Sequence, residues 1–165
     1  MKKYLVDDTD YYVYVKGEGP ILLMAYGFPF DSRLYLPAVE RLSARFCCVV
    51  PDLRGFGQTK LGANGRDPVG RPRVKMGRFA EDLASLTAIF SCQRRNRAEK
   101  VIFCGLSMGG YISLSFARRR MDRLAGLIFC DSNELPDSPE AAARRNELAD
   151  TITSQGVPDL VENMI

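Results

Sequence analysis

The segment Gly105-Leu106-Ser107-Met108-Gly109 places a serine between two glycines in a Gly-x-Ser-x-Gly pattern. An apolar run at residues 101–104 precedes it and a predicted helix follows, so Ser107 falls at a strand-to-helix turn. Such a turn needs small residues two positions before and after the serine, because its backbone is strained. We therefore predict that Ser107 is a nucleophile; the alternative is that the pattern is only a tight turn.

A general base for this serine is missing, because the chain contains no histidine. The imidazole that normally takes the serine proton cannot come from these 165 residues. Lys75 and Lys100 are the conceivable partners for a serine–lysine pair, but Lys100 begins a predicted strand at the end opposite Ser107. The sequence thus predicts a nucleophile without its base.

The composition bounds the size and partners of the protein. With 165 residues, 46% hydrophobic and 26% charged, the chain is long enough for one core and short for two, so residues 1–165 are predicted to form a single domain. The net charge is +3, and its local clusters, residues 94–97 and 118–120, are typical of solvated helix ends. No aromatic residues interleave with these clusters, so we expect no nucleic-acid partner.

The five cysteines indicate a reducing compartment. Four of them lie in predicted buried strands and one lies on a predicted helix: Cys47, Cys48, Cys104, Cys130 and Cys92. No Cys-x-x-Cys spacing exists, so neither a metal site nor a disulfide framework is expected. No apolar stretch reaches the length of a membrane span, and we expect a cytoplasmic protein without a membrane partner.

The elements that position Ser107 follow from the apolar pattern. Short runs without alternation predict parallel strands at residues 21–25, 46–50, 101–104 and 124–130. Residues 4–6 and 11–15 predict an antiparallel hairpin, and apolar residues at helical spacing predict helices at 36–45, 79–90 and after Ser107. The fold class is therefore α/β, with a mainly parallel sheet led by a hairpin.

Two further segments lie outside this alternation. Residues 60–75 are rich in Gly, Pro, Arg and Asp and predict a surface loop. Ser138 and Pro139 predict the cap and first residue of a helix ending near Gly156, followed by a short helix at 159–165. The ending at Ile165 carries no helix-stop signal, and we expect residues 133–165 to be the start of a helical lid.

Four segments resemble the α/β-hydrolase superfamily, and the resemblance covers nearly the whole chain. Tyr26-Gly27-Phe28-Pro29 follows the third strand, where that family usually has His-Gly-x-Pro. Residues 51–59, Pro-Asp-Leu-Arg-Gly-Phe-Gly-Gln-Thr, follow the fourth strand and resemble its D-x-R-G-x-G-x-S segment. Residues 105–110 resemble its nucleophile elbow, and residues 79–83 resemble the helix that leads to the elbow strand.

The resemblance implies a hydrolase of small carboxylic esters, lactones or thioesters that works through an acyl-enzyme on Ser107. Similar short members include enol-lactonases, carboxylesterases and cofactor-free haloperoxidases, which need no cofactor or metal. By position, the backbone N–H groups of Met108 and Phe28 would form the oxyanion hole. Tyr26 replaces the usual histidine of the loop, which weakens this assignment without removing it.

Two aspartates, Asp52 and Asp131, stand at positions where an active-site acid is conceivable. Asp52, with Arg54, is interpreted as a structural turn tied by an arginine–carboxylate contact rather than an active-site acid. Asp131 ends the sixth predicted strand, where some members carry the triad acid, and Ser132 beside it is interpreted as part of the entrance to the lid. The more usual acid and the histidine follow the seventh and eighth strands of the family.

Only six strands are predicted, so we expect an incomplete domain that is inactive as given. Two alternatives stay open: a non-catalytic binding protein on the same scaffold, and a gene fragment without independent function. The oligomeric state is left open.

Overall fold

The computed structural model describes residues 1–93, 100–135 and 137–155. The chain divides into two compact units, Met1–Glu134 and Leu135–Ile165. The division falls close to residue 133, where we expected a lid to begin, although the role of the second unit as a lid stays a prediction. The basic cluster at residues 94–97 lies outside the described residues.

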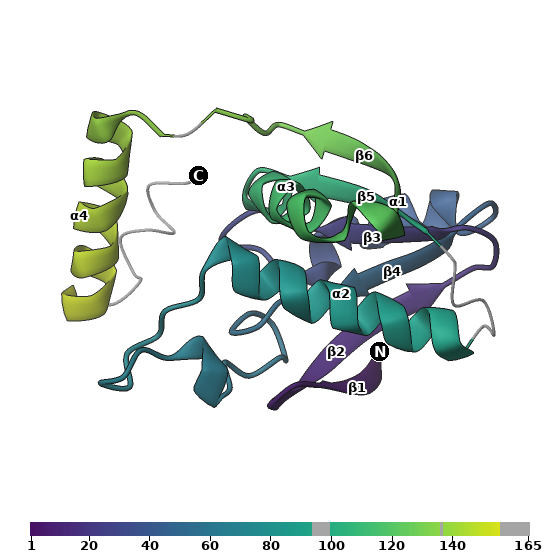
Figure 1. The fold of residues 1–165 in the computed structure, drawn as a ribbon, viewed down its shortest axis with the longest axis horizontal. Coiled ribbons are helices and arrows are strands. Elements are labelled where there is room, and N and C mark those ends of the chain that lie inside the picture. The colour runs from purple at the N-terminus through teal and green to yellow at the C-terminus, as the bar shows by residue number, and fades with distance from the viewer. Residues whose placement is uncertain (94–99, 136, 156–165) are drawn as a thin grey trace. The chain divides into compact units, whose positions relative to one another are not determined.

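The first unit is built on one six-stranded sheet with the order β1-β2-β4-β3-β5-β6 (Figure 1). Its strands are β1 (Lys2–Val6), β2 (Thr9–Lys16), β3 (Ile21–Ala25), β4 (Cys47–Pro51), β5 (Val101–Leu106) and β6 (Leu124–Cys130). β2 pairs antiparallel with β1 and β4, and the remaining pairs are parallel. This confirms the predicted mainly parallel sheet led by an antiparallel hairpin.

Helices cover both faces of the sheet. The α-helices are α1 (Leu36–Leu42), α2 (Met76–Gln93), α3 (Met108–Arg120) and α4 (Pro139–Gln155), and the 3-10 turns are η1 (Ser32–Tyr35), η2 (Ala63–Gly65) and η3 (Met121–Arg123). Figure 1 shows α2 and α3 side by side in front of the strands, with α1 behind them. β3 and β4 are consequently buried along their whole length. Within the described ranges, no helix is both long and apolar enough to cross a membrane.

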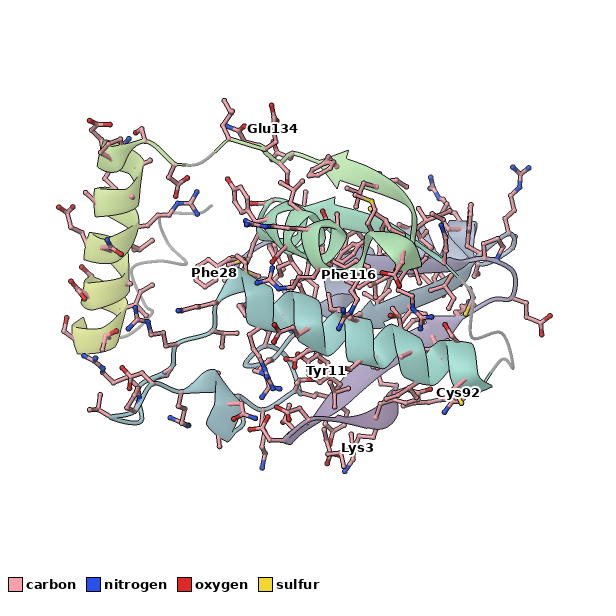
Figure 2. The ribbon with its side chains drawn as sticks, viewed as in Figure 1. Lys3, Tyr11, Phe28, Cys92, Phe116 and Glu134 are labelled. Atoms are coloured by element: carbon pink, nitrogen blue, oxygen red, sulfur yellow. The ribbon has the colours of Figure 1, made fainter. Side chains whose placement is uncertain are left out.

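The core forms where the apolar faces of these helices meet the strands. Phe79, Leu83 and Leu86 of α2 are buried, as their helical spacing predicts. From α3, the fully buried Phe116 (Figure 2) places its ring 5.4 Å from that of Phe103 on β5. Each such side chain contributes about 1.5–3 kcal/mol by leaving water, so packing fixes how α3 sits on β5.

β6 is an edge strand of the sheet as described. It pairs with β5 alone, and Ile128 and Phe129 are 45% and 42% exposed. β5 lies between β3 and β6 in the sheet, which leaves β6 at the edge. Along β6, the apolar run of the sequence therefore does not correspond to complete burial.

The second unit contains α4. The Ser138 hydroxyl accepts a hydrogen bond from the Ala141 N–H at 3.3 Å, which confirms the predicted helix cap. The predicted end near Gly156 and the predicted helix at 159–165 lie outside the described residues.

Candidate active site

Ser107 lies at a strained turn between β5 and α3. Its φ of 49° and ψ of −112° are uncommon for a residue with a side chain, and the side chain is exposed. The turn is held from both sides, because the Ser107 N–H donates to the Cys130 carbonyl at 3.1 Å and the Gly110 N–H donates to the Ser107 carbonyl at 2.8 Å. The predicted elbow geometry is confirmed.

The glycines of the motif allow α3 to pack against the end of β3. A Cβ atom on Gly109 would lie 1.9 Å from the carbonyl oxygen of Ala25, and one on Gly105 would lie 2.4 Å from the carbonyl oxygen of Gly109. Both contacts are with backbone atoms, which cannot swing aside. The first turn of α3 therefore begins directly beside the loop that follows β3.

That loop brings Gly27 against Ser107. A Cβ atom on Gly27 would lie 3.0 Å from the Ser107 Cβ and 3.6 Å from its Oγ. Phe28 follows and is 45% exposed (Figure 2). No described residue accepts a hydrogen bond from the N–H of Phe28 or Met108. Two open donors thus lie on the segments that adjoin Ser107, while their convergence on one oxyanion stays a prediction.

Tyr26 occupies the position of the family's usual histidine without a role in proton transfer. It is fully buried, its hydroxyl accepts a hydrogen bond from the Leu53 N–H at 2.5 Å, and burial raises the pKa of that hydroxyl. Tyr26 therefore ties the loop after β3 to the loop after β4. The effect of this tyrosine on the oxyanion donors stays a prediction.

Asp52 has a structural role. Its buried carboxylate accepts hydrogen bonds from the N–H groups of Ser32 at 3.0 Å and Gln58 at 2.8 Å. A Cβ atom on Gly57, whose φ is 53°, would lie 2.3 Å from that carboxylate. The turn therefore wraps around Asp52 and uses its charge to satisfy backbone donors. The structural interpretation of this segment is confirmed.

Arg54 is the centre of a buried charge network. It is fully buried, and its guanidinium donates to Asp82 at 2.7 and 3.1 Å and to Asp8 at 2.5 Å. Burial by itself lowers the pKa of Arg54, but the hydrogen bonds to Asp82 and Asp8 outweigh it and hold that pKa above its ordinary value. The Tyr11 hydroxyl also donates to Asp82, at 2.7 Å. The predicted arginine–carboxylate contact is therefore made to Asp82 and Asp8 rather than to Asp52, and it joins the hairpin, the loop after β4 and α2.

Sequence reasoning missed the partners of this network and the role of Ser132. Asp82 could have been recognised as a single acid on the apolar face of α2, next to Leu83. The Ser132 hydroxyl donates to the carbonyl of Ser107 at 2.8 Å, a contact with no sequence signal.

Asp131 follows β6 with a φ of 43° and is exposed. Lys100 precedes β5 whereas Ser107 follows it, so the two lie at opposite ends of that strand as predicted.

The sheet order and the strained strand-to-helix turn at Ser107 together define the class of protein, and the chain belongs to the α/β-hydrolase fold family. The family model matches residues 20–152. The match includes the loop after β3, the loop after β4 and the nucleophile turn.

Known proteins share this architecture over the whole chain. A thermophilic esterase from Thermogutta terrifontis superimposes with a TM-score of 0.85 and 33% identity, covering 99% of this chain and 58% of the esterase. The enol-lactonase from Burkholderia xenovorans superimposes with a TM-score of 0.80 and 23% identity, covering 99% of this chain and 58% of the lactonase. Among curated proteins, haloalkane dehalogenase 2 of Mycobacterium bovis is 28% identical over 68% of this chain. The chain spans 35% of the length of that dehalogenase.

Proposed function

We propose that this chain carries the nucleophile and oxyanion donors of a hydrolase acting on small carboxylic esters, lactones or thioesters. The observation that carries the proposal is the strained Ser107, exposed at the end of β5 with Gly27 packed against it. A strained backbone persists only where the surrounding structure holds it, and such positions cluster at functional sites. The resemblance to an esterase at 33% identity adds to this reading of the site.

The proposed chemistry is acyl transfer in two steps. The Ser107 Oγ attacks the carbonyl carbon of the substrate, the carbonyl oxygen becomes an oxyanion, and the alcohol or thiol leaves with a proton. Water then attacks the acyl-serine and releases the acid. The N–H groups of Phe28 and Met108 are the proposed donors to the oxyanion, each worth about 3 kcal/mol in such sites. The N-terminal end of α3 adds its positive dipole at the same place.

The chain by itself is proposed to be nearly inactive. No histidine is present to take the proton of Ser107, and nucleophile and base act as one unit in such enzymes. Oxyanion donors alone still favour slow attack on reactive substrates. A non-catalytic binding protein on this scaffold is the alternative, and it differs in one observable respect, because it would form no acyl-serine.

The test is covalent labelling of the 165-residue chain with an activated acetate ester, followed by mass mapping. We expect slow acetylation at Ser107, at a rate that does not change with pH near neutrality, and very little turnover. Ser107→Ala should abolish the adduct, while Ser85→Ala, an exposed serine of α2, should leave it unchanged.

Two outcomes decide against parts of the proposal. Robust turnover that disappears in Ser107→Ala would show that another residue serves as base. The proposal that the chain is nearly inactive would then be wrong. The absence of any Ser107 adduct, with the fold intact, would favour the binding protein.

A further inference from the structure

A cavity lies at the beginning of α2, away from Ser107. It has a volume of about 740 Å³, and its lining contains neither Ser107 nor Phe28 nor Met108. Five cationic side chains line it: Arg66, Arg73, Lys75, Arg78 and Arg119. The lining has only two acids, Asp67 and Glu81, so cations outnumber carboxylates.

Asp67 contributes little negative charge to the cavity because it is already used. Its carboxylate accepts hydrogen bonds from the N–H groups of Val69 at 3.0 Å and Arg71 at 2.9 Å, and the Arg71 guanidinium donates to it at 2.8 Å. Arg71 is not part of the lining. The Asp67 side chain is 5% exposed, so its carboxylate is largely covered by these contacts.

Three of the five cations lack a carboxylate partner among the described residues. Arg78 pairs with Asp7 and Asp82, and Arg119 lies 3.7 Å from Glu81. By contrast, Arg66 donates only to the neutral carbonyl of Gly70, at 2.8 Å. The side chains of Arg73 and Lys75 form neither an ion pair nor a hydrogen bond within the described part of the chain, so both are available to a ligand.

The backbone holds these cations in place. Residues 65–73 form a small hairpin, in which the Asp67 N–H donates to the Arg71 carbonyl at 2.9 Å and the Arg73 N–H to the Gly65 carbonyl at 2.8 Å. The hairpin leads into the start of α2 (Figure 1), and the first turn of α2 contains no acidic residue. The surface loop predicted at residues 60–75 therefore contains an ordered hairpin that lines part of the cavity.

We propose that this cavity binds a soluble small molecule that carries at least two phosphate groups. A single phosphate would leave most of these cations unpaired and most of the volume empty, whereas a diphosphate can meet several of them at once. The guanidinium fork matches phosphate oxygens in pairs, and Lys75 adds a point charge. The site is independent of the proposed acyl transfer at Ser107.

The experiment titrates pyrophosphate into the 165-residue chain at low ionic strength, by calorimetry and by amide NMR shifts. We expect shifts confined to residues 64–81 and around Arg119. In the double variant Arg73→Gln, Lys75→Gln, the Kd should rise about tenfold or more, since two charge-assisted hydrogen bonds are removed. The matched control Arg41→Gln, Lys60→Gln removes two exposed cations outside the cavity and should leave the Kd unchanged. Added salt should weaken binding.

Lys75→Gln alone keeps the test decisive if the double variant is unstable, because that side chain is exposed and forms no hydrogen bond or ion pair within the described residues. It should shift the Kd in the same direction. Equal affinity in the cavity and control variants, or no binding at millimolar pyrophosphate, would overturn the proposal. Displacement of pyrophosphate by a short single-stranded oligonucleotide that binds more tightly would also overturn it, in favour of a nucleic-acid surface.

Discussion

The hydroxyl of Ser132 donates a hydrogen bond of 2.8 Å to the carbonyl oxygen of Ser107. The donor follows the edge strand β6, and the acceptor is the strained residue at the end of β5. Gly110 makes room for this contact, because a Cβ atom there would lie 2.0 Å from the Ser132 Oγ. The turn at Ser107 is therefore anchored from the neighbouring strand as well as from its own helix.

We expect Ser132→Ala to lower the free energy of unfolding by about 1 kcal/mol, the usual value of one such hydrogen bond. The acetylation rate of Ser107 should also fall, since the turn loses one of its restraints. Urea unfolding and mass mapping measure the two effects. Ser85→Ala is the control, and an equal loss of stability in both variants would argue against a specific role for Ser132.

The close approach of α3 to β3 predicts opposite outcomes for two glycine substitutions. Gly109→Ala places a Cβ atom 1.9 Å from the Ala25 carbonyl oxygen and should destabilise the fold by more than about 3 kcal/mol. Gly126→Ala, on β6, meets nothing within 4 Å and should be neutral or slightly stabilising. Thermal unfolding of both variants checks this. A stable Gly109→Ala chain would mean that α3 does not pack so closely on β3.

Asp8 is expected to make stability depend on pH. Burial alone raises the pKa of its carboxyl, but hydrogen bonds from the Asn64 N–H and from Arg54 outweigh burial and hold that pKa below its ordinary value. Its stabilisation is therefore present above the unfolded-state pKa of about 4 and is lost as pH falls through the lower folded-state pKa.

Asp8→Asn should accordingly cost about 1–2 kcal/mol at neutral pH, and the difference from the native chain should shrink below about pH 4. Urea unfolding at several pH values measures this. Asp10→Asn, which removes the half-exposed partner of Lys3, is the control and should cost about 0.5 kcal/mol or less. A constant difference across the pH range would contradict the role assigned to Asp8.

The cysteines should differ sharply in reactivity. Burial, with a contribution from Cys130 whose Sγ is 3.9 Å away, raises the pKa of the Cys104 thiol to about 12. Because the thiolate is the reactive form, Cys104 should resist maleimide at neutral pH, whereas the exposed Cys92 should react. Mass mapping with Cys92→Ser as control tests this. Equal labelling of Cys104 in the folded chain would show that β5 is less buried than described.

How far the sequence predicts the fold depends on whether the signal is local. Unbroken apolar runs such as residues 21–25 predicted strands, and the residues before and after Ser107 predicted the turn, because both patterns arise from neighbours along the chain. Ser138 predicted the start of α4 for the same reason. The choice of Ser107 as candidate nucleophile also needed nothing beyond its own motif.

The contacts between residues distant in the chain came only from the tertiary structure. Asp82 and Arg54 are 28 residues apart and Tyr11 and Asp82 are 71 apart, so no pattern along the chain joins them. The cationic cavity likewise combines the hairpin at residues 65–73, the start of α2 and Arg119 of α3. The sequence by itself determined where the strands and the turn at Ser107 lie, because burial and backbone strain restrict the residue types at neighbouring positions. Which side chains meet was decided by the packing of helices on the sheet, because that depends on atoms distant in sequence.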